Sequence, residues 1–482
     1  MNDNRPALAA LCLTMLMPSL DTSIANASLP VLAHAFGASF AQVQWVVLAY
    51  LLTITALIVG AGRLGDLLGR GRLLFAGIAL FTVASLLCGL APTLATLAAA
   101  RVLQGLGAAA MLALTVALVG ETMPRDRTGA AMGLLGTMSA IGTTLGPSLG
   151  GLLTTALGWR AIFLVNVPVG LVNLWLARRH LPMARPAAAG TGPRFDIPGT
   201  VLLAGTLAAY AIATTVGRGH ALAWMAAALA GGLAFVAVEA CAAAPLVRLS
   251  MFRDAALCAG LATTALVATV IATTLVVGPF YLARALALPA VIVGVVLSCG
   301  PMVSALAGAP AGRVVDRVGA SRVVVAGLAA MFAGTLLLAL LPSGLGVAGW
   351  LAGIVVTTVG YASFQAANNT ALMHGAAAAQ RGLVSGLMSL ARNLGLVTGV
   401  AALGAVFATA SSSADVASAG AAAVARGMHR TFAVDAALMG VALAIALAGA
   451  WLRRGGADDP PTGTLDAALT PSSPPASPRT SA

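Results

Sequence analysis

Two residues of opposite charge lie inside long apolar segments of the sequence. Asp21 stands in the run LDTSIANASLP, and Arg101 follows about seven residues after the start of another apolar segment. At a rise of about 1.5 Å per residue, both side chains would lie about 10 Å from the same face of a membrane core about 30 Å thick. A charge at that depth costs about 2.5–3.5 kcal/mol, so we expect the two residues to face a cavity and to pair.

The chemistry that such a pair could perform is proton transfer. A carboxylate beside a guanidinium changes its proton occupancy when its solvent exposure changes, and a cavity that opens to alternate sides of a membrane supplies that change. Asp21 and Arg101 therefore predict proton coupling. The alternative is a structural ion pair that holds two helices together.

The segments that position these residues must be membrane helices. The chain has 482 residues, of which 60% are hydrophobic and 8% are charged, whereas soluble domains are about 25% charged. This composition excludes a soluble globular protein and predicts an all-α polytopic membrane protein. We expect fourteen spans, at about residues 7–28, 43–61, 73–91, 94–119, 129–156, 160–177, 199–216, 222–243, 255–280, 288–308, 323–341, 346–372, 382–409 and 431–451.

A charged sequence between the second and third spans occurs a second time. Gly62–Arg72 (GRLGDLLGRGR) and Gly312–Arg322 (GRVVDRVGASR) match at Gly, Arg, Asp, Gly and the final Arg, each shifted by 250 residues. Each sequence would be a short turn at the membrane surface, and the repeat predicts an internal duplication. The predicted domains are a six-helix bundle at 1–180, a cytoplasmic linker with an inserted transmembrane hairpin at 181–254, a second six-helix bundle at 255–452, and a disordered cytoplasmic tail at 453–482.

The basic residues predict the orientation in the membrane. All 26 are arginines, and with the N-terminus inside, nineteen fall on the cytoplasmic side and five outside. This positive-inside pattern predicts a multi-pass protein of the cell inner membrane with both termini in the cytoplasm. Anionic lipid headgroups then account for the net charge of +12, and no nucleic-acid partner is expected.

Several kinds of chemistry require residues that the sequence lacks. Its His and Cys residues have no metal-ligand spacing, no Ser lies in a GxSxG motif, and a chain without lysine cannot form a GxxxxGK nucleotide-binding loop. We therefore expect neither an enzyme nor an ATP-driven pump. No metal and no cofactor are expected, and the proton is the predicted coupling ion.

The second half does not repeat the charge pair. The positions 250 residues after Asp21 and Arg101 hold Ile and Leu, so we expect proton handling in the first half alone. Asp435 and Glu239 are expected near span ends, at the membrane interface. The residues predicted to line a substrate cavity are Gln365, Asn368, Asn369 and Arg392, together with Asn26, Gln104 and Asn166. For the second-half amides, hydrogen bonding between helices is an equal alternative.

The fifth span is unusually rich in glycine. Gly142, Gly146, Gly150 and Gly151 surround Pro147 in one membrane segment. Glycine lets neighbouring backbones approach closely, and proline within a span permits a bend. The pattern predicts a bending, tightly packed helix.

Together these features resemble the major facilitator superfamily, and within it the fourteen-span drug:proton antiporters, over about residues 7–452. Gly62–Arg72 resembles that family's signature loop, and LDTSIANASLP resembles the first-span motif that carries an acidic residue. RVLQGLGAA, which begins at Arg101, is similar to the fourth-span motif whose arginine is linked to proton transfer. The fifth-span run resembles the motif held typical of exporters.

The resemblance implies a conformational latch between the two halves at the cytoplasmic end. Its residues would be Gly62, Asp66, Gly69, Arg70, Arg72, Gly312, Arg313, Asp316 and Gly319. A basic turn that only fixes orientation is the alternative, but it does not explain the Gly and Asp that both copies share. Some members of the family carry an acid deep in the second half, and none is expected here. The resemblance therefore does not imply recognition of cationic drugs, and with Arg101 and Arg392 against Asp21 the cavity would suit neutral or anionic compounds as well.

The expected function is proton-coupled export of small hydrophobic drugs or toxic metabolites by alternating access, which would give multidrug efflux and antibiotic resistance. Export of one endogenous metabolite and uncoupled facilitated transport stay open as alternatives, as does a non-transporting membrane receptor. The expected partners are a small-molecule substrate and the lipid bilayer. We expect a monomer and leave a periplasmic adaptor open.

Overall fold

A computed structural model describes residues 5–123, 128–183, 197–215, 218–241, 249–375, 381–411 and 419–455. Within these ranges the regular structure is entirely helical. The helices are α1 (Arg5–Ala27), α2 (Leu29–Phe36), α3 (Phe40–Val43), α4 (Trp45–Leu68), α5 (Arg70–Leu90), α6 (Leu94–Thr122), α7 (Thr128–Ala156), α8 (Ala161–Leu164), α9 (Asn166–His180), α10 (Ile197–Thr215), α11 (Arg218–Cys241), η1 (Leu249–Arg253), α12 (Ala255–Phe280), η2 (Tyr281–Ala285), α13 (Ala290–Val318), α14 (Ala320–Leu340), η3 (Ser343–Leu345), α15 (Gly346–Gly375), α16 (Arg381–Thr398), η5 (Gly399–Leu403), α17 (Gly404–Ala410) and α18 (Ala421–Gly455).

The predicted all-α membrane architecture is confirmed. Thirteen helical segments in the described ranges are long and apolar enough to cross a membrane. The 29-residue helix α7 is not among them, because its many Gly, Ser and Thr residues make it less apolar. A total of fourteen membrane spans therefore stays a prediction, as do the domain boundaries. Most of the predicted linker and the tail from residue 456 lie outside the described residues.

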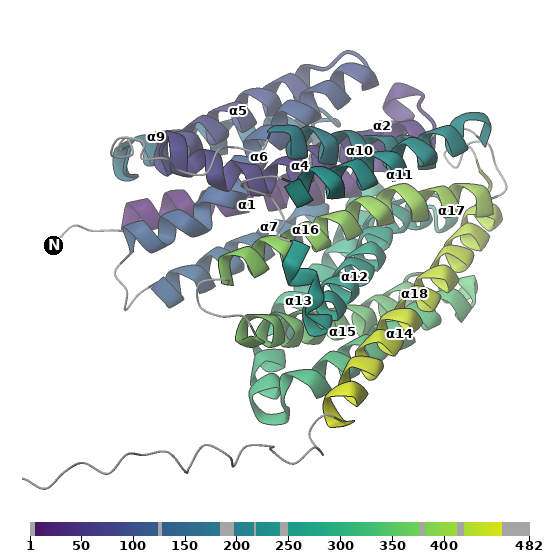
Figure 1. The fold of residues 1–482 in the computed structure, drawn as a ribbon. Helices are drawn as coiled ribbons and strands as arrows, with labels where there is room; N and C mark the ends of the chain where they lie inside the picture. Colours follow the sequence, from purple (N-terminus) through teal and green to yellow (C-terminus); the bar gives the residue numbers. More distant parts are fainter. Residues whose placement is uncertain are drawn as a thin grey trace, which may run out of the picture.

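The helices form two groups, which Figure 1 shows as purple-to-blue helices and as green-to-yellow helices. In the first group α6 packs on α4 and α5, while α1 packs on α7 and α9. In the second group α14 packs on α15 and α18, while α12 packs on α16 and α18. The groups meet along two pairs of helices, α7 with α13 and α4 with α16.

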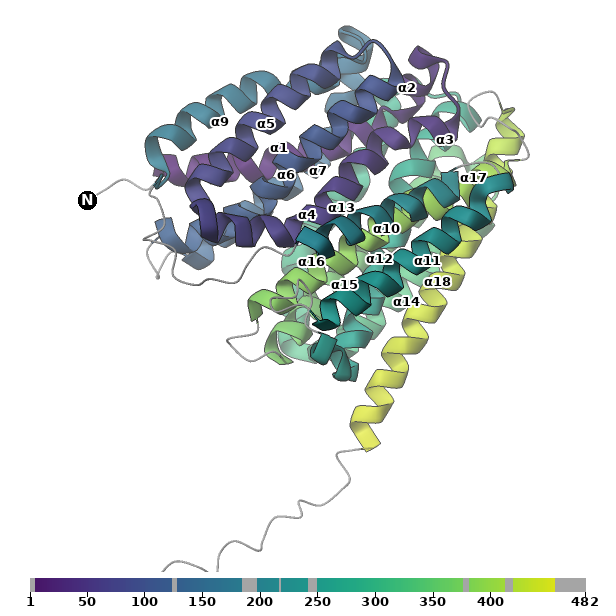
Figure 2. The ribbon, with the colours of Figure 1, turned by 45° about the horizontal axis from the view of Figure 1, so that its top comes forward.

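The hairpin of α10 and α11 joins these two groups from the side. The two helices pack on each other, and α10 also contacts α4 of the first group and η5 of the second (Figure 2). Of the most apolar stretch of α11 only 6% is buried inside the protein. The corresponding figure for the stretch of α10 that begins at Pro198 is 39%. The hairpin is therefore attached mainly through α10.

The duplication is visible in the backbone of the two charged sequences. Gly69 separates α4 from α5 with φ +96°, and Gly319 separates α13 from α14 with φ +92°. These φ values are strained for residues with a side chain, which explains why both copies have glycine there. The predicted surface loop is shorter than expected, because residues 62–68 and 312–318 are the last turns of α4 and α13.

The glycines of α7 lie against two other helices. A Cβ atom at Gly142, Gly146 or Gly150 would come within 2.4–3.3 Å of α1, on residues that flank Asp21. A Cβ atom at Gly151 would collide with the carbonyl of Ala290, at the start of α13. Helix α7 therefore packs backbone to backbone on the helix of the acidic residue and also on the second half of the protein.

We predict that adding one methyl group at Gly146 destabilises the protein. Gly146→Ala would push Cβ into Ser23, and overpacking of this kind costs about 1–3 kcal/mol. The matched control is Gly136→Ala in the same helix, where nothing lies within 4 Å of the added atom. Thermal unfolding of the purified protein in detergent should show a lower Tm for the first variant only. Equal Tm values for the two variants would contradict the packing described for α7.

Candidate functional site

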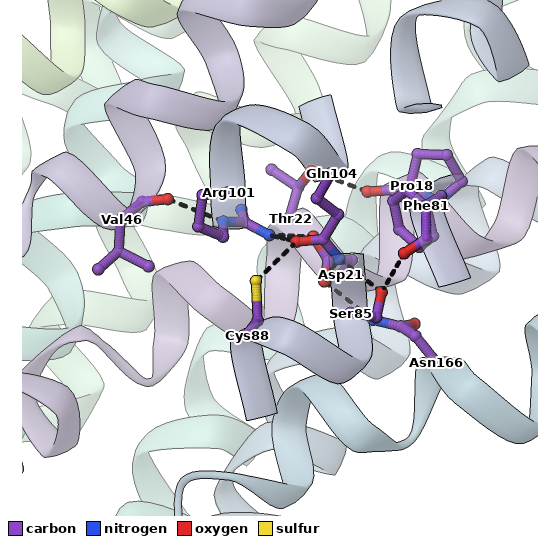
Figure 3. Close-up of polar contacts among 10 residues, drawn as sticks. All are labelled: Pro18, Asp21, Thr22, Val46, Phe81, Ser85, Cys88, Arg101, Gln104 and Asn166. Carbon is purple, nitrogen blue, oxygen red and sulfur yellow. Dashed lines mark hydrogen bonds and ion pairs between the residues drawn. The ribbon is translucent and has the colours of Figure 1, made fainter. Parts of the chain in front are cut away.

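Asp21 lies at the centre of a buried polar cluster in the first half (Figure 3). Its side chain is 1% exposed. Arg101 Nη1 on α6 donates to Oδ2 at 2.5 Å. Gln104 Nε2, one turn further along α6, and Asn166 Nδ2 at the start of α9 each donate to Oδ1 at 2.9 Å. Three N–H donors from two helices thus converge on one carboxylate.

Arg101 is held on all sides by groups of the first half. Its side chain is 0% exposed, and Nε donates to the carbonyl of Val46 on α4 at 2.8 Å. The guanidinium carbon lies 4.2 Å from the centre of the Tyr50 ring, which adds a cation–π contact. Nη2 has no hydrogen-bond partner among the described residues. The arginine is therefore fixed in place with one N–H group left unsatisfied.

Gln104 links the ion pair to α5. Its Oε1 accepts from Arg101 Nη1 at 2.6 Å, and its Nε2 donates to Ser85 Oγ at 2.9 Å as well as to Asp21. Because an amide has both an acceptor and two donors, Gln104 can serve the cation and the anion at once. Any movement of α6 relative to α1 or α5 would break several of these bonds together.

Asp21 and Arg101, which the sequence placed at the same depth, are in direct contact. In the described part of this conformation neither of them faces the solvent-filled cavity that was expected. Both side chains are sealed between helices. Gln104 and Asn166, predicted to line a substrate cavity, are instead buried partners of Asp21. Asn26, in the same prediction, is 4% exposed, and its Oδ1 has no partner in the described part of the chain. Sequence spacing gave the depth of these amides but not the direction in which they point.

A cavity of about 330 Å³ lies in the second half, between α12, α15 and α16. All four of the second-half residues predicted as cavity lining contribute to it: Gln365, Asn368, Asn369 and Arg392. Asn368 also donates to Thr264 Oγ1 at 2.9 Å and to the carbonyl of Gly260 at 3.2 Å, so it also serves the interhelical role considered as its alternative. The remaining lining includes aromatic and Met side chains.

Asp435 is a buried acid that the sequence interpretation missed. It was expected near a span end, but α18 begins at Ala421, about ten residues earlier than predicted, and Asp435 is 0% exposed. Thr273 Oγ1 on α12 donates to Oδ1 at 3.3 Å, and Oδ2 has no partner among the described residues. The second half therefore does contain a buried carboxyl group. Thr273 does not line the cavity, although Ile271 two residues earlier does.

Glu239, the other acid expected at the interface, is also buried, with 3% of its surface exposed. It lies close to the end of α11, as predicted from the sequence, but its side chain is covered. The start of α18 could have been found from the apolar residues Val424 and Met428, which are four apart and both buried. Arg426, His429 and Arg430 obscured that helical pattern.

The predicted latch residues have different partners in the two copies. Arg70 Nη1 lies 2.6 Å from Glu121 Oε1 on α6, and Arg72 Nε donates to the carbonyl of Met183 at 2.9 Å. Arg313 and Asp316 of the second copy are exposed, with no partner in the described ranges. The side chain of Asp66 lies outside the described residues. A contact between the halves at this end stays a prediction for another conformation.

The two halves make several specific contacts at the other end of the helices. Gln44, just before α4, donates from Nε2 to the carbonyl of Val400 at 2.7 Å. Val400 lies in η5, a π-helical turn that locally departs from the α-helical pattern. The ring of Phe40 packs edge-on against Phe280 and Phe407, with centroids 4.8 and 5.4 Å apart. On α7, the backbone N–H of Ser148 donates to Ser298 Oγ on α13 at 3.2 Å.

These contacts close the protein at one end. They lie near the start of α4 and the end of α12, the end opposite to the Gly69 and Gly319 turns. The cavity residues Gln365 and Arg392 lie further from the closed end, within α15 and α16. The cavity therefore lies on the side of these contacts that carries the Gly69 and Gly319 turns.

Comparisons with known proteins agree with this architecture. A family model described as the Major Facilitator Superfamily matches residues 11–400 and 258–478. The chain is 36% identical over 197 residues to the Riboflavin transporter RibZ of Clostridioides difficile strain 630, which covers 41% of this chain and 43% of that protein. It is 37% identical over 272 residues to the Multidrug resistance protein Stp of Mycobacterium tuberculosis strain CDC 1551 / Oshkosh, covering 54% of this chain and 50% of that protein. The chain thus spans about half the length of these curated relatives.

A solved structure has a similar fold. A bacterial homologue of the human lysosomal transporter Spinster, in an inward-facing and unoccupied conformation, superimposes with a TM-score of 0.68. The match covers 94% of this chain and 98% of that chain, at 16% sequence identity.

We predict that Asp435 depends on its one hydroxyl partner. Thr273→Val leaves a buried carboxyl group without a hydrogen bond among the described residues, at a cost of about 1–3 kcal/mol. The control is Thr335→Val, because the buried Thr335 hydroxyl bonds only to its own helix backbone. Thermal melting in detergent should place Thr273→Val below Thr335→Val. If the two variants have the same Tm, the Asp435–Thr273 contact contributes nothing to the stability of the protein.

We predict that Gln44 stabilises the closed end. Gln44→Leu removes the donor to Val400, a loss of about 0.5–1.5 kcal/mol that should increase opening several-fold. Opening can be measured as the labelling rate of a cysteine placed at Ala401, which is 0% exposed, with a membrane-impermeant maleimide. Gln42→Leu is the control, since the Gln42 side chain bonds only to Ser39 at the surface. An unchanged labelling rate in Gln44→Leu would mean that the Gln44 hydrogen bond is not needed and that other contacts, such as those of the Phe40 ring, keep this end closed.

Proposed function

The chain belongs to the major facilitator superfamily, and we propose that it is a proton-coupled exporter of small hydrophobic compounds that works by alternating access. The observation that carries this proposal is the buried pair of Asp21 and Arg101, fixed by Gln104 and Asn166. A charged pair with no solvent contact is costly to assemble, and breaking it by removing one partner costs about 3–5 kcal/mol. A titratable group in such a position suits a role in which it is neutralised by a proton.

Protonation of Asp21 would loosen the cluster in a defined way. Neutralising the carboxylate removes its charge-assisted bond to Arg101 and weakens the bonds from both amides. The guanidinium would then be a buried cation without a counter-ion, so the cluster must rearrange. The ion-paired arrangement seen here corresponds to the proton-free state in this proposal.

The glycine contacts of α7 support a path from the acid to the second half. Gly146 packs against Ser23, two residues from Asp21, and the neighbouring Gly151 packs against the start of α13. Ser23 Oγ also donates to the carbonyl of Thr143 at 2.8 Å. A rearrangement around Asp21 would move α1 and, with it, the contact between α7 and α13.

The membrane potential supplies enough energy for this exchange. One proton charge that moves inward across about 100 mV releases about 2.3 kcal/mol, which sustains a gradient of about 50-fold in a neutral solute. With the orientation predicted by the arginines, the closed end of the structure faces outward. The cavity would then receive its substrate from the cytoplasm, and both termini would be cytoplasmic in the inner membrane. A monomer is sufficient for this cycle, and an adaptor is not required by it.

A second candidate function is transport of one specific metabolite. It is favoured by the similarity to the protein named Riboflavin transporter RibZ, beside that to the protein named Multidrug resistance protein Stp. The amide and hydroxyl groups of the second-half cavity would suit a polar metabolite better than a simple hydrocarbon-like drug. Riboflavin is therefore a necessary compound in any test of substrate range.

We predict that Asp21→Asn abolishes proton-coupled transport but not insertion in the membrane. Asparagine keeps the size of the side chain but cannot exchange a proton. In everted vesicles with a pH-sensitive dye, riboflavin or another uncharged aromatic compound should release protons through the wild type and not through the variant. Susceptibility of cells to a panel of toxic compounds provides a second measurement.

The matched control is Asp254→Asn. Asp254 caps the start of α12 through bonds to the N–H groups of Ala256 and Leu257, and asparagine caps helices equally well. This change removes one acid of the same type outside the cluster and should leave transport intact. Full proton-coupled transport by Asp21→Asn would overturn the proposed role of the pair.

A further inference from the structure

The second-half cavity contains one charge that the proposed function does not use. Arg392 on α16 lines the cavity and is exposed to it, and neither an acid nor a hydrogen-bond acceptor contacts it in the described ranges. No Asp or Glu lines this cavity among the described residues. The first half differs, since the charge of Arg101 is balanced by Asp21 at 2.5 Å. The cavity therefore presents an unbalanced positive charge to whatever enters it.

The polar lining forms one stripe beside this charge. Ser385, Ser389 and Arg392 are spaced by four and three residues on α16, which places them on one face of the helix. Gln365 and Asn369 have the same four-residue spacing on α15 and line the same cavity. Amide and hydroxyl groups can donate or accept, but a guanidinium only donates, so the stripe as a whole selects for an acceptor.

The rest of the lining is apolar and partly aromatic. Tyr361, Met373 and Met388 are half-buried and contribute a ring and flexible thioether side chains, whereas the Phe364 ring is only 2% exposed. Such side chains adapt to flat ring systems of different outline. At about 330 Å³ the cavity lies within the range of small-molecule sites, which is about 300–1,000 Å³.

We propose that this cavity binds aromatic organic anions, with the carboxylate or a comparable oxyanion on Arg392 and the ring system against Tyr361 and Met388. The inference rests on the proposed function, because it names the substrate class of that transporter. It also separates this chain from exporters that select cationic compounds, since a ligand cation would meet Arg392 and no acid in the cavity. A flat or bidentate oxyanion fits the planar guanidinium better than it fits an ammonium group.

The test uses three probes that differ only in their charged group. They are 4-(1-pyrenyl)butyrate, its methyl ester and 4-(1-pyrenyl)butylammonium. Binding to the purified full-length protein is measured by the change in pyrene fluorescence. We expect the carboxylate to bind about tenfold or more tightly than the ammonium, as a charge-assisted hydrogen bond allows, with the ester between them.

Two variants assign the preference to the cavity. Arg392→Gln should remove the difference between carboxylate and ammonium, while Arg392→Lys should keep part of it. Arg253→Gln removes one exposed arginine of η1, which is not among the cavity-lining residues, and should leave the preference unchanged. Tighter binding of the ammonium, or a carboxylate preference that survives in Arg392→Gln, would overturn the proposal.

Binding and transport separate this inference from the proposed function. In Asp21→Asn, carboxylate binding should persist, because Asp21 lies outside the cavity lining, while proton-coupled efflux of the same probe should stop. If binding shows the anion preference but Asp21→Asn still couples efflux to protons, the proposed mechanism fails and the anion site stands. If the wild type couples riboflavin efflux to protons but shows no anion preference, the anion site fails alone.

Discussion

A carboxylate and a guanidinium that face each other across 2.5 Å, both out of contact with solvent, are the interaction on which the first half is built. Moving two charges out of water costs several kcal/mol for each ion, and their attraction repays this only when other hydrogen bonds complete the site. Gln104, Asn166, Ser85 and the carbonyl of Val46 supply those bonds from four different helices. Helices α4, α5, α6 and α9 are thus joined to α1 through one buried cluster that contains Asp21.

The glycine-rich helix α7 connects this cluster with the rest of the molecule. Close backbone contact leaves little room for compression, because protein interiors are packed as densely as organic crystals. A small shift of α1 is therefore passed on to α7 rather than absorbed by side chains. Pro147 and Gly151 meet the start of α13 on the same helix. One element thus contacts both the helix that carries Asp21 and the opposite half of the protein.

Much of this arrangement could be predicted from the sequence. The number of residues between the start of each span and its charged residue placed Asp21 and Arg101 at the same depth. The shift of 250 residues between the two charged sequences predicted the equivalent turns at Gly69 and Gly319. Depth does not give direction, however. Whether Gln104 points at Asp21 or into a cavity depends on the rotation of α6 relative to its neighbours, which is decided by tertiary packing.

Asp435 was missed for a different physical reason. Charged residues at 426 and 430 interrupt the apolar pattern at the start of α18, so hydropathy alone placed the helix start too late. In the structure these residues lie on a helix that is already packed against the bundle, as the burial of Val424 and Met428 shows. When a membrane helix extends beyond its apolar stretch into a segment with charged residues, a continuous apolar run in the sequence does not mark the start of that helix.

The hairpin makes the two sides of the protein unequal toward the surrounding lipid. Helix α10 contacts both α4 and η5 at one seam between the halves, and α11 packs on α10, so the hairpin covers this seam. On the opposite side, the seam of α7 and α13 has no such cover among the described elements. The two seams between the halves therefore differ in how much of the described chain covers them.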